Sequence, residues 1–378
     1  MLSQTIFSLR IGKLVMKILY CSYSQIPSHF ANSIAVMKQC DSLNSLTELR
    51  SILINGCNAN GDNVFSLYGV KPFPLILLPK WVLRHNEFWL KVFVLVYAWI
   101  YRPDVVYSRD ILLNDWLCRF HINNICEIHQ LDQENYNFSL IYKKILRRIM
   151  EKRELQAIVC ISKSLAEECL EFGVPKKKLA VLHSGIDLVE CANIEPAKIP
   201  DFFQPHPLAA YVGSLQKGKG IELILQMAEL APDINFLIVG GSQGQISESK
   251  NLKHIPQLSH KKALSYMKAA DFLLLPLTEQ SYKFHSPLKL FEYMAMGKTV
   301  IASDNVDIRE IITPLETGML ADSTQPEDFI KKIKLVYENP QLKKTLEENS
   351  KRQVTQFTWK IRSQKIIALV RGIKYGKK

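Results

Sequence analysis

Lys289 and Glu292 are the residues of this chain best placed for chemistry, because they stand three positions apart and therefore on one face of a predicted helix. Ser286 suits the N-cap of that helix and Pro287 its first position, where a missing N–H costs nothing. The free N–H groups at such an end attract phosphate, and Lys289 adds a cation there. Glu292 can accept hydrogen bonds from sugar hydroxyls. The pattern predicts a sugar-phosphate site; a solvated lysine and glutamate on an amphipathic helix is the alternative.

A glycine-rich turn, Gly213–Gly220 (GSLQKGKG), supplies a second set of cations. It separates a predicted strand, 208–212, from a predicted helix, 221–230. Glycines allow a backbone to approach phosphate closely, and Lys217 and Lys219 can neutralise it. A solvated lysine in a purely structural turn is the alternative interpretation.

Other polar candidates follow predicted strands of the first half of the chain. His129 follows strand 125–128, and Arg109 follows strand 104–107. In open α/β sheets, ligands bind where loops leave the carboxyl ends of the strands, although a histidine there can also be satisfied by a neighbouring backbone group. The loop 22–33 after the first strand contains no glycine, which argues against a dinucleotide-binding turn. Its candidates are Ser28, Asn32 and Ser33, the last also suited to cap a helix over 34–46.

Alternating strands and helices in both halves of the chain predict two doubly wound α/β domains with a cleft between them. We expect a leader or tail over 1–15, an N-terminal domain over 16–190, a linker over 191–206, a C-terminal domain over 207–355, and a last helix over 356–378. The pattern further predicts a short strand over 64–67, a loop over 71–79, and a buried strand over 299–302 that the helix ending at Gly297 precedes.

Composition is that of a globular protein, with 47% hydrophobic and 22% charged residues among 378. Eight scattered cysteines without a C-x-x-C pair predict buried free thiols in a reducing cytosol. No convincing signal peptide is present. The net charge of +12 is compatible with nucleic acid, an anionic membrane or an acidic substrate; since no nucleic-acid signature accompanies it, we favour a membrane surface and an anionic substrate.

Two segments bear on membrane contact. Residues 143–153 (KKILRRIMEKR) form a basic amphipathic segment that can lie on anionic lipid or pack its apolar stripe into a core. The segment 87–101 is nearly all apolar, and its run of 14 residues, 88–101, is shorter than the roughly 20 that span a bilayer. It is either a buried core helix or a membrane-facing one.

The stretch Ser286–Asp304 resembles the nucleotide-sugar motif of the retaining GT-B glycosyltransferases of family four, or group one. That motif has two glutamates eight positions apart, of which Glu292 matches the second and Phe284 replaces the first. Lys219 matches the lysine of the family's phosphate-binding turn, whereas Ser214 stands at its arginine. The resemblance extends to further stretches: PDVVYSR at 103–109, Glu127-x-His129, the turn His183–Asp187, and the start of the last helix at 357–359.

The resemblance implies a metal-independent, hexosyltransferase-type enzyme without a cofactor. It would move a sugar, with retention, from a nucleoside diphosphate sugar to a glycan or lipid-linked acceptor at the cytoplasmic membrane face, in polysaccharide or glycolipid synthesis. His129, Lys219 and Lys289 would be catalytic. The nucleotide site would comprise Glu292, Ser286, Leu288, Gly213, Ser214 and Lys217, and the acceptor side Ser28, Asn32, Ser33 and Arg109. A non-catalytic GT-B-like binding subunit and a GT-B sugar-nucleotide epimerase are the alternatives, and a nucleic-acid binder rests on charge alone.

Overall fold

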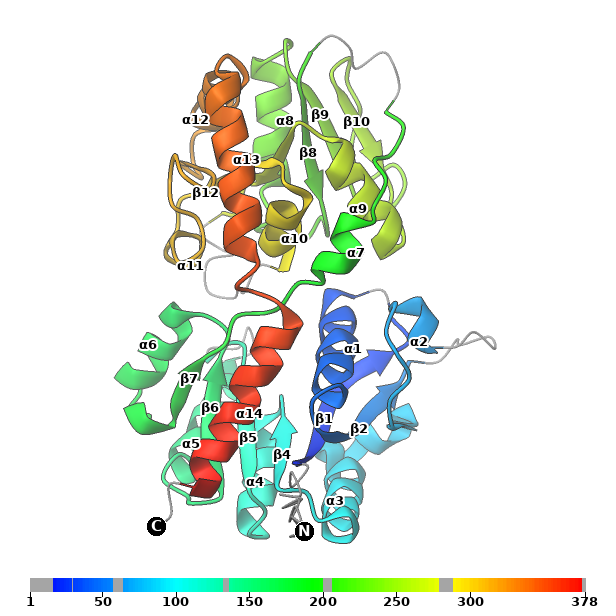
Figure 1. Ribbon diagram of the computed structural model, residues 1–378, viewed down its shortest axis with the longest axis vertical. Helices are drawn as coiled ribbons and strands as arrows, with labels where there is room; N and C mark the ends of the chain where they lie inside the picture. Colours follow the sequence, from blue (N-terminus) through cyan, green and yellow to red (C-terminus); the bar gives the residue numbers. More distant parts are fainter. Residues whose placement is uncertain are drawn as a thin grey trace, which may run out of the picture.

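The computed structural model describes residues 16–28, 30–56, 64–131, 136–199, 206–278 and 288–375. Figure 1 shows two α/β domains stacked along the long axis of the molecule. Both contain a parallel sheet covered by helices on its two faces, as the apolar strand sequences predict. Some of the expectations concern residues outside these described ranges, namely 1–15, Cys57, Phe284, Ser286 and Pro287.

In the N-terminal domain, the described residues form a seven-stranded parallel sheet in the order β3-β2-β1-β4-β5-β6-β7. Chain order reverses beside β1, whose neighbours are β2 and β4, so the loops after β1 and β4 meet at the switch point where α/β sheets bind ligands. The strands are β1 (Lys17–Ile26), β2 (Glu48–Asn55), β3 (Leu75–Leu78), β4 (Val105–Ser108), β5 (Asn124–Ile128), β6 (Leu155–Cys160) and β7 (Leu179–Val181).

Helices α1 and α14 pack on one face of this sheet, and α3, α4 and α5 pack on the other. The described helices of this part of the chain are α1 (Ala31–Asn44), α2 (Val64–Leu67), η1 (Lys80–Leu83), α3 (Arg84–Tyr101), α4 (Ile111–Arg119), α5 (Tyr136–Ile149), α6 (Lys163–Glu171), η2 (Lys176–Lys178) and α7 (Leu188–Ala192).

The described residues of the C-terminal domain form a six-stranded parallel sheet in the order β10-β9-β8-β11-β12-β13. Its strands are β8 (Leu208–Val212), β9 (Asn235–Val239), β10 (Leu252–Ile255), β11 (Phe272–Leu275), β12 (Thr299–Ser303) and β13 (Met319–Ala321). The helices of this domain are α8 (Ile221–Leu230), α9 (His260–Ala269), α10 (Leu288–Met296), α11 (Val306–Arg309), α12 (Pro326–Tyr337) and α13 (Pro340–Val354), and the chain then continues into α14 (Trp359–Tyr375).

Helix α14 returns from the C-terminal domain and runs along the N-terminal domain (Figure 1). The chain passes between the two domains twice, near Ile186 and near Phe357. These two segments are joined by a hydrogen bond from the Ile186 N–H to the Phe357 carbonyl at 2.8 Å. Gly185 is needed there, because a Cβ at this position would lie 2.5 Å from the Trp359 nitrogen. Ser164, which follows β6, donates a hydrogen bond to Asp307, which follows β12. The carboxyl edges of the two sheets therefore face each other.

Two expected elements are wrong. The segment Val64–Leu67 is the short helix α2 rather than a strand, and 71–79 contains the strand β3 rather than only a loop. Among the described residues, β3 is an edge strand that pairs with β2 alone, so the flanking Pro74 and Pro79 remove no ladder hydrogen bond from a central strand. The linker expected over 191–206 is preceded by a helix, α7, that no periodicity indicated.

The apolar stripe of the basic segment 143–153 faces the core, since Ile145, Leu146 and Ile149 are buried against β5 and β6. Helix α5 ends at Ile149, and its basic residues remain on the outer side. The cysteines among the described residues are buried and free, as expected. Within the described ranges, no helix combines the length and apolar character needed to span a bilayer.

Candidate functional site

Lys289, in the first turn of α10, reaches back toward the end of β8. Its Nζ donates to the Tyr211 hydroxyl at 2.8 Å and lies 4.1 Å from the centroid of the same ring. The amine rests against Gly213, where a Cβ would come within 1.9 Å of Nζ. Burial, with the nearby Lys219 charge adding to it and Glu292 opposing it, lowers the pKa of Lys289 to about 7. A glycine and a tyrosine thus hold this lysine at the start of α10.

The turn after β8 brings Lys219 to the same place, since its charge contributes to the lowered pKa of Lys289. Burial lowers the pKa of Lys219 as well. Gly220 adopts the left-handed conformation with φ +72°, and a Cβ there would lie 1.7 Å from the Pro276 carbonyl oxygen. Ser214 and Lys217 are exposed on the outer side of the turn. The turn therefore contributes one lysine, Lys219, to the neighbourhood of Lys289.

Glu292 lies one turn further along α10 and is hydrogen-bonded to His260 at the start of α9, with 2.7 Å between Oε1 and Nε2. Burial alone would lower the pKa of His260, but the hydrogen bond to Glu292 and the charges of Glu292 and Glu190 raise it. Glu190 also pairs with the buried Lys38 of α1 at 2.9 Å. The carboxylate expected to bind a ribose is therefore oriented by a histidine and linked to the N-terminal domain.

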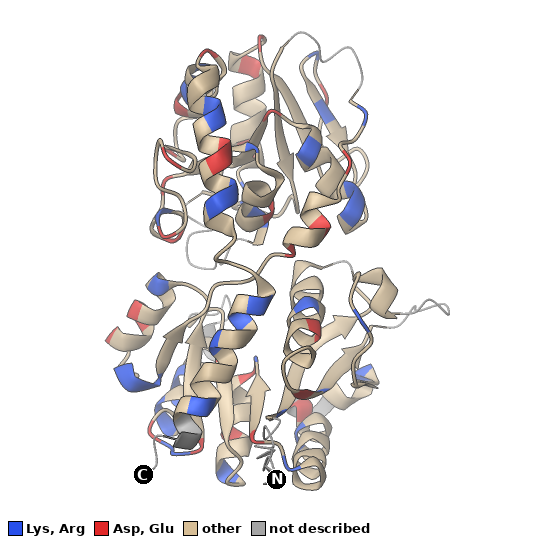
Figure 2. Ribbon diagram, in the orientation of Figure 1, with Lys and Arg blue, Asp and Glu red and all other residues tan. Residues whose placement is uncertain are grey.

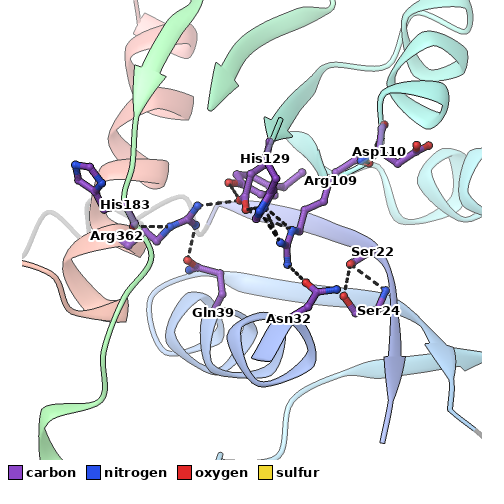
Figure 3. Close-up of polar contacts among 12 residues, drawn as sticks. Ser22, Ser24, Asn32, Gln39, Arg109, Asp110, His129, His183 and Arg362 are labelled. Carbon is purple, nitrogen blue, oxygen red and sulfur yellow. Dashed lines mark hydrogen bonds and ion pairs between the residues drawn. The ribbon is translucent and has the colours of Figure 1, made fainter. Parts of the chain in front are cut away.

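Arg109 and His129, which follow β4 and β5, meet Asn32 of the first turn of α1, as Figure 3 shows. Arg109 Nη1 donates to the Asn32 side-chain oxygen at 2.7 Å, and its Nη2 lies 2.6 Å from His129 Nε2. Burial and the Arg109 charge lower the pKa of His129, so its imidazole is neutral near pH 7. This arrangement offers a guanidinium and a neutral imidazole to a polar substrate.

Glu127 is the buried hub beneath these side chains. Its Oε1 lies 2.7 Å from His129 Nε2 and 3.3 Å from Arg109 Nε. Its Oε2 accepts hydrogen bonds from the Tyr107 hydroxyl and, at 2.9 Å, from Arg362 of α14. Burial alone would raise the pKa of this carboxyl, but the two guanidinium groups hold it well below the ordinary range. Glu127 is thus a fixed anion that orients Arg109 and His129.

Arg362 connects this hub to other parts of the molecule. It donates from Nη1 to the Gln39 side chain at 2.7 Å and from Nε to the His183 carbonyl at 3.0 Å. The His183 ring stacks edge-on against Phe291 of α10, with 6.5 Å between centroids. A chain of contacts therefore runs from the Arg109–His129 side to the helix that carries Lys289 and Glu292.

The remaining predicted residues have local roles. Ser33 lies inside α1, which begins at Ala31, and its hydroxyl donates to the Gln25 carbonyl at 3.0 Å; the expected cap at Ser33 is wrong. Ser28 exchanges hydrogen bonds with the Tyr68 hydroxyl through its backbone. Leu288 opens α10 and is half-buried. Ser286 lies outside the described residues.

The structure thus gathers the predicted residues into two groups, Lys219–Lys289–Glu292 on the C-terminal domain and Asn32–Arg109–His129 on the N-terminal domain. Sequence reasoning missed the residues that position them: Tyr211, His260 and Arg362. Within the described ranges, no three His, Cys, Asp or Glu side chains gather as a metal site would require. Metal independence stays a prediction.

Comparisons with known proteins agree with this architecture. The family model described as Glycosyltransferase Family 4 matches residues 57–190, and that described as Glycosyl transferases group 1 matches residues 195–353. An uncharacterized glycosyltransferase of Methanocaldococcus jannaschii is 26% identical over 257 residues, which cover 64% of this chain and 64% of that protein. The N,N'-diacetylbacillosaminyl-diphospho-undecaprenol alpha-1,3-N-acetylgalactosaminyltransferase of Campylobacter jejuni is 25% identical over 56% of this chain and 59% of its own. The matches thus span less than two thirds of these relatives.

Solved structures share the fold over nearly the whole chain. Anabaena HepE in complex with UDP superimposes with a TM-score of 0.74 at 14% identity, covering 94% of this chain and 100% of that chain. Sucrose-phosphate synthase from Thermosynechococcus elongatus gives a TM-score of 0.73 at 18% identity, covering 96% and 100%. At these identities the likeness concerns the fold alone.

Proposed function

Because the chain belongs to the GT-B glycosyltransferases of family four, or group one, we propose that it moves a sugar from a nucleoside diphosphate sugar to a hydroxyl of a glycan or lipid-linked acceptor. The observation that carries this proposal is the pair Lys219 and Lys289: the Lys289 amine donates to Tyr211 and lies against Gly213, at the start of the turn that carries Lys219. Two such cations at the start of a helix are stabilised by an anion between them, and a diphosphate has that charge.

In this reaction the bond between the anomeric carbon and the diphosphate breaks, and the leaving phosphate gains negative charge. Preorganised cations and N–H groups stabilise such charge as it develops. Lys219, Lys289 and the backbone N–H groups at Ser286 and Leu288 would supply this stabilisation without a metal ion. Glu292 would accept hydrogen bonds from the ribose. The new bond would form on the face that the leaving group vacates, so the anomeric configuration would be retained.

His129 and Arg109 would contact the transferred sugar and the acceptor from the opposite domain, with Asn32 holding Arg109 in place. HepE, which shares the fold, was crystallised with UDP-glucose, and the Campylobacter relative is named for transfer to a diphospho-undecaprenol. These names favour a nucleotide-sugar donor and a lipid-linked acceptor. We place the reaction at the cytoplasmic face of the membrane, in polysaccharide or glycolipid synthesis.

A thermal-shift panel of UDP, GDP, ADP and TDP tests the donor site. A nucleotide present at about 100 times its dissociation constant should stabilise the folded chain by about 2.7 kcal/mol. We expect one nucleotide to raise the melting temperature of the wild type and not that of Glu292→Ala. If none stabilises the wild type, the donor site is refuted.

Turnover is tested with Lys219→Ala, which should lower the rate more than tenfold because the leaving phosphate loses a cation. Lys331→Ala is the control, since Lys331 is an exposed lysine of α12 in the same domain. A fully active Lys219→Ala protein would contradict the mechanism. Nucleotide binding without turnover in the presence of lipid-linked and glycan acceptors would instead identify a non-catalytic binding subunit.

A further inference from the structure

Helix α3 presents an apolar face to solvent. Trp89, Phe93, Val96 and Ile100 recur at helical spacing and point away from the sheet, while Leu90, Val94 and Ala98 on the opposite side are buried in the core. Ile100 is 67% exposed and its neighbour Trp99 is 75% exposed. The solvent side of a helix in a soluble domain is ordinarily polar. Here both sides of the helix are apolar.

The exposed aromatic surface continues beyond α3. Trp81 of η1 packs edge-on against Trp89 with centroids 6.5 Å apart, and Phe88 packs against Trp116 of α4 at 5.7 Å. Trp116 in turn contacts the exposed Phe120. We call this surface the aromatic face; its exposed members are Trp81, Phe88, Trp89, Phe93, Val96, Trp99, Ile100 and Phe120.

Charge is almost absent from this stretch of α3. Lys91 is the one charged residue between Phe88 and Tyr101 in the sequence, and its side chain is buried, with Nζ 3.8 Å from Glu87. Figure 2 accordingly shows α3 as a largely tan helix. A contiguous apolar surface of this kind on a soluble domain marks a site of interaction with a partner or a membrane.

Basic residues lie on the same layer of the domain. Helices α3, α4 and α5 cover one face of the N-terminal sheet, and α5 exposes Lys144, Arg147 and Arg148 together with Leu140 and Ile141. Arg102, after the end of α3, is exposed as well, whereas Arg148 and Arg119 are both paired with Asp115 of α4. Tryptophan and other aromatic side chains favour the headgroup level of a bilayer, and exposed lysine and arginine are attracted to anionic lipid.

We propose that the aromatic face is a membrane-docking surface, on which α3 lies along an anionic bilayer with its tryptophans at headgroup level and α5 turned toward the lipid phosphates. Helix α3 is parallel to such a surface rather than across it, in the manner of an interfacial helix. The stripe of the basic segment 143–153 is buried, so α5 contributes charge and α3 contributes the apolar contact.

Docking on this face would bring the acceptor side of the site beside the bilayer. The Tyr23 hydroxyl, on β1, lies 2.7 Å from the Glu87 carboxylate of α3 and 2.6 Å from Asp110, the residue that follows Arg109. The first turn of α3 is therefore joined to the loop that carries Arg109. This consequence rests on the proposed transfer to a lipid-linked acceptor, whereas the membrane contact can be measured without turnover.

Vesicle flotation tests the proposal on the full chain. We expect the wild type to float with vesicles of phosphatidylcholine containing phosphatidylglycerol, and to bind vesicles of phosphatidylcholine alone at least tenfold more weakly. Trp89→Ser/Phe93→Ser/Trp99→Ser should reduce binding to the anionic vesicles more than tenfold. The control, Leu230→Ser/Leu335→Ser/Tyr337→Ser, removes exposed apolar side chains from the C-terminal domain and should bind as the wild type does.

Charge reversal on α5 separates the electrostatic contribution of α5 to membrane binding from the apolar contribution of α3. Lys144→Glu/Arg147→Glu should weaken binding to anionic vesicles more than tenfold, since each basic residue near the surface contributes about fivefold. Brominated lipids should quench most of the wild-type tryptophan emission, because Trp81, Trp89 and Trp99 lie on the aromatic face whereas Trp359 is buried elsewhere.

Three outcomes would overturn the proposal: wild-type protein that does not float, flotation that the aromatic-face substitutions leave unchanged, or a concentration-dependent dimer that the same substitutions make monomeric. The last would assign the face to a second copy of the chain. Nucleotide-induced thermal shifts should be equal in the wild type and the α3 variant. Loss of those shifts in the wild type would refute the donor site without touching the membrane result.

Discussion

The lowered pKa of Lys289 predicts that donor binding takes up a proton. Burial is its main cause, the Lys219 charge adds to it, and the value of about 7 compares with an ordinary 10.5. Above pH 7 the amine of the empty protein is therefore mostly neutral. A bound diphosphate favours the charged form and raises the pKa again. Binding should thus consume up to one proton at about pH 8, and affinity should fall as the pH rises from about 7 to 9.

Calorimetry of diphosphate binding in buffers of different ionisation enthalpy measures this uptake. Lys289→Met should bind more weakly and take up no proton through this residue. Lys331→Met, which alters an exposed lysine of α12, should retain the wild-type uptake. An uptake that persists unchanged in Lys289→Met would assign the proton to another group.

The buried pair between Arg362 and Glu127 should be costly to break. Both side chains are about 5% exposed, and the two groups meet at 2.9 Å. Removing one partner of a buried pair costs about 3–5 kcal/mol when the other charge is left uncompensated; because Arg109 remains 3.3 Å from Glu127, the cost here should lie at the lower end, about 3 kcal/mol. We expect Arg362→Met to lower the free energy of unfolding by that amount, and Arg362→Met/Glu127→Gln to cost less than the sum of the two single changes.

Urea unfolding of the four proteins measures this coupling, and kinetics add a readout specific to the site. Because Glu127 orients His129 and Arg109, Arg362→Met should lower kcat and shift its pH profile, while nucleotide binding at Glu292 is unaffected. Additive losses of stability, or an unchanged pH profile in the folded variant, would show that Arg362 serves packing alone.

Residues that position the site could not be predicted from spacing. Glu292 and Lys289 stand on one helical face, so their proximity follows from the sequence. Tyr211 lies 78 positions from Lys289, His260 lies 32 from Glu292, and Arg362 lies 235 from Glu127. No local pattern relates residues this far apart; only the order of strands and the return of α14 bring them together.

Among the elements, the turn before α8 has a strict requirement for glycine at position 220. Gly220 and Gly244 have nearly the same backbone conformation, with φ +72° and +71°, but differ in surroundings. A Cβ at Gly220 would lie 1.7 Å from the Pro276 carbonyl oxygen, whereas nothing lies within 4 Å of one at Gly244. Gly244→Ala should cost about 1–2 kcal/mol of backbone strain. Gly220→Ala adds a clash with backbone and should cost more.

Thermal unfolding of the two variants separates backbone strain from steric clash, because both variants have the strain and only Gly220→Ala has the clash. Gly220→Ala should also weaken nucleotide binding, since Gly220 directly follows Lys219, while Gly244→Ala should not. Equal melting temperatures would mean that α8 shifts away from Pro276 at no cost.

The elements themselves were largely predictable from the sequence. Apolar runs such as 208–212 and 272–275 have no polar alternation and are central strands. Strand β3 was missed because prolines flank it, and they are tolerated only because β3 is at the sheet edge. Valine and phenylalanine in the four residues of α2 favour a strand, but tertiary packing decides the structure of so short a segment.

At the scale of the molecule, the two domains meet through the N-terminus of α6. Its first N–H groups, at Lys163 and Ser164, donate to Glu310 Oε1 at 2.7 and 3.1 Å. The Ser164 hydroxyl donates to Asp307. A helix N-terminus favours a carboxylate, so these contacts hold the carboxyl edges of the two sheets together. Burial nevertheless raises the pKa of both Glu310 and Asp307 above the ordinary 4.5 and 3.8.

The raised pKa values of Glu310 and Asp307 predict that the contact between the two domains depends on pH. Opening returns both carboxyls to water and lowers their pKa values, so the closed form binds protons more tightly and is favoured as the pH falls and these carboxyls become protonated. His183, 3.4 Å from Glu310, acts in the opposite sense to the two carboxyls, because burial lowers its pKa to about 4 in the closed form and opening would let it bind a proton more tightly. The two raised carboxyl pKa values therefore predict that the radius of gyration from solution scattering increases as the pH rises through the range in which Glu310 and Asp307 ionise. Asp307→Asn/Glu310→Gln, which keeps the hydrogen-bonding shape without the charge, should abolish the change, and an increase that persists in this variant would place the pH-dependent group elsewhere.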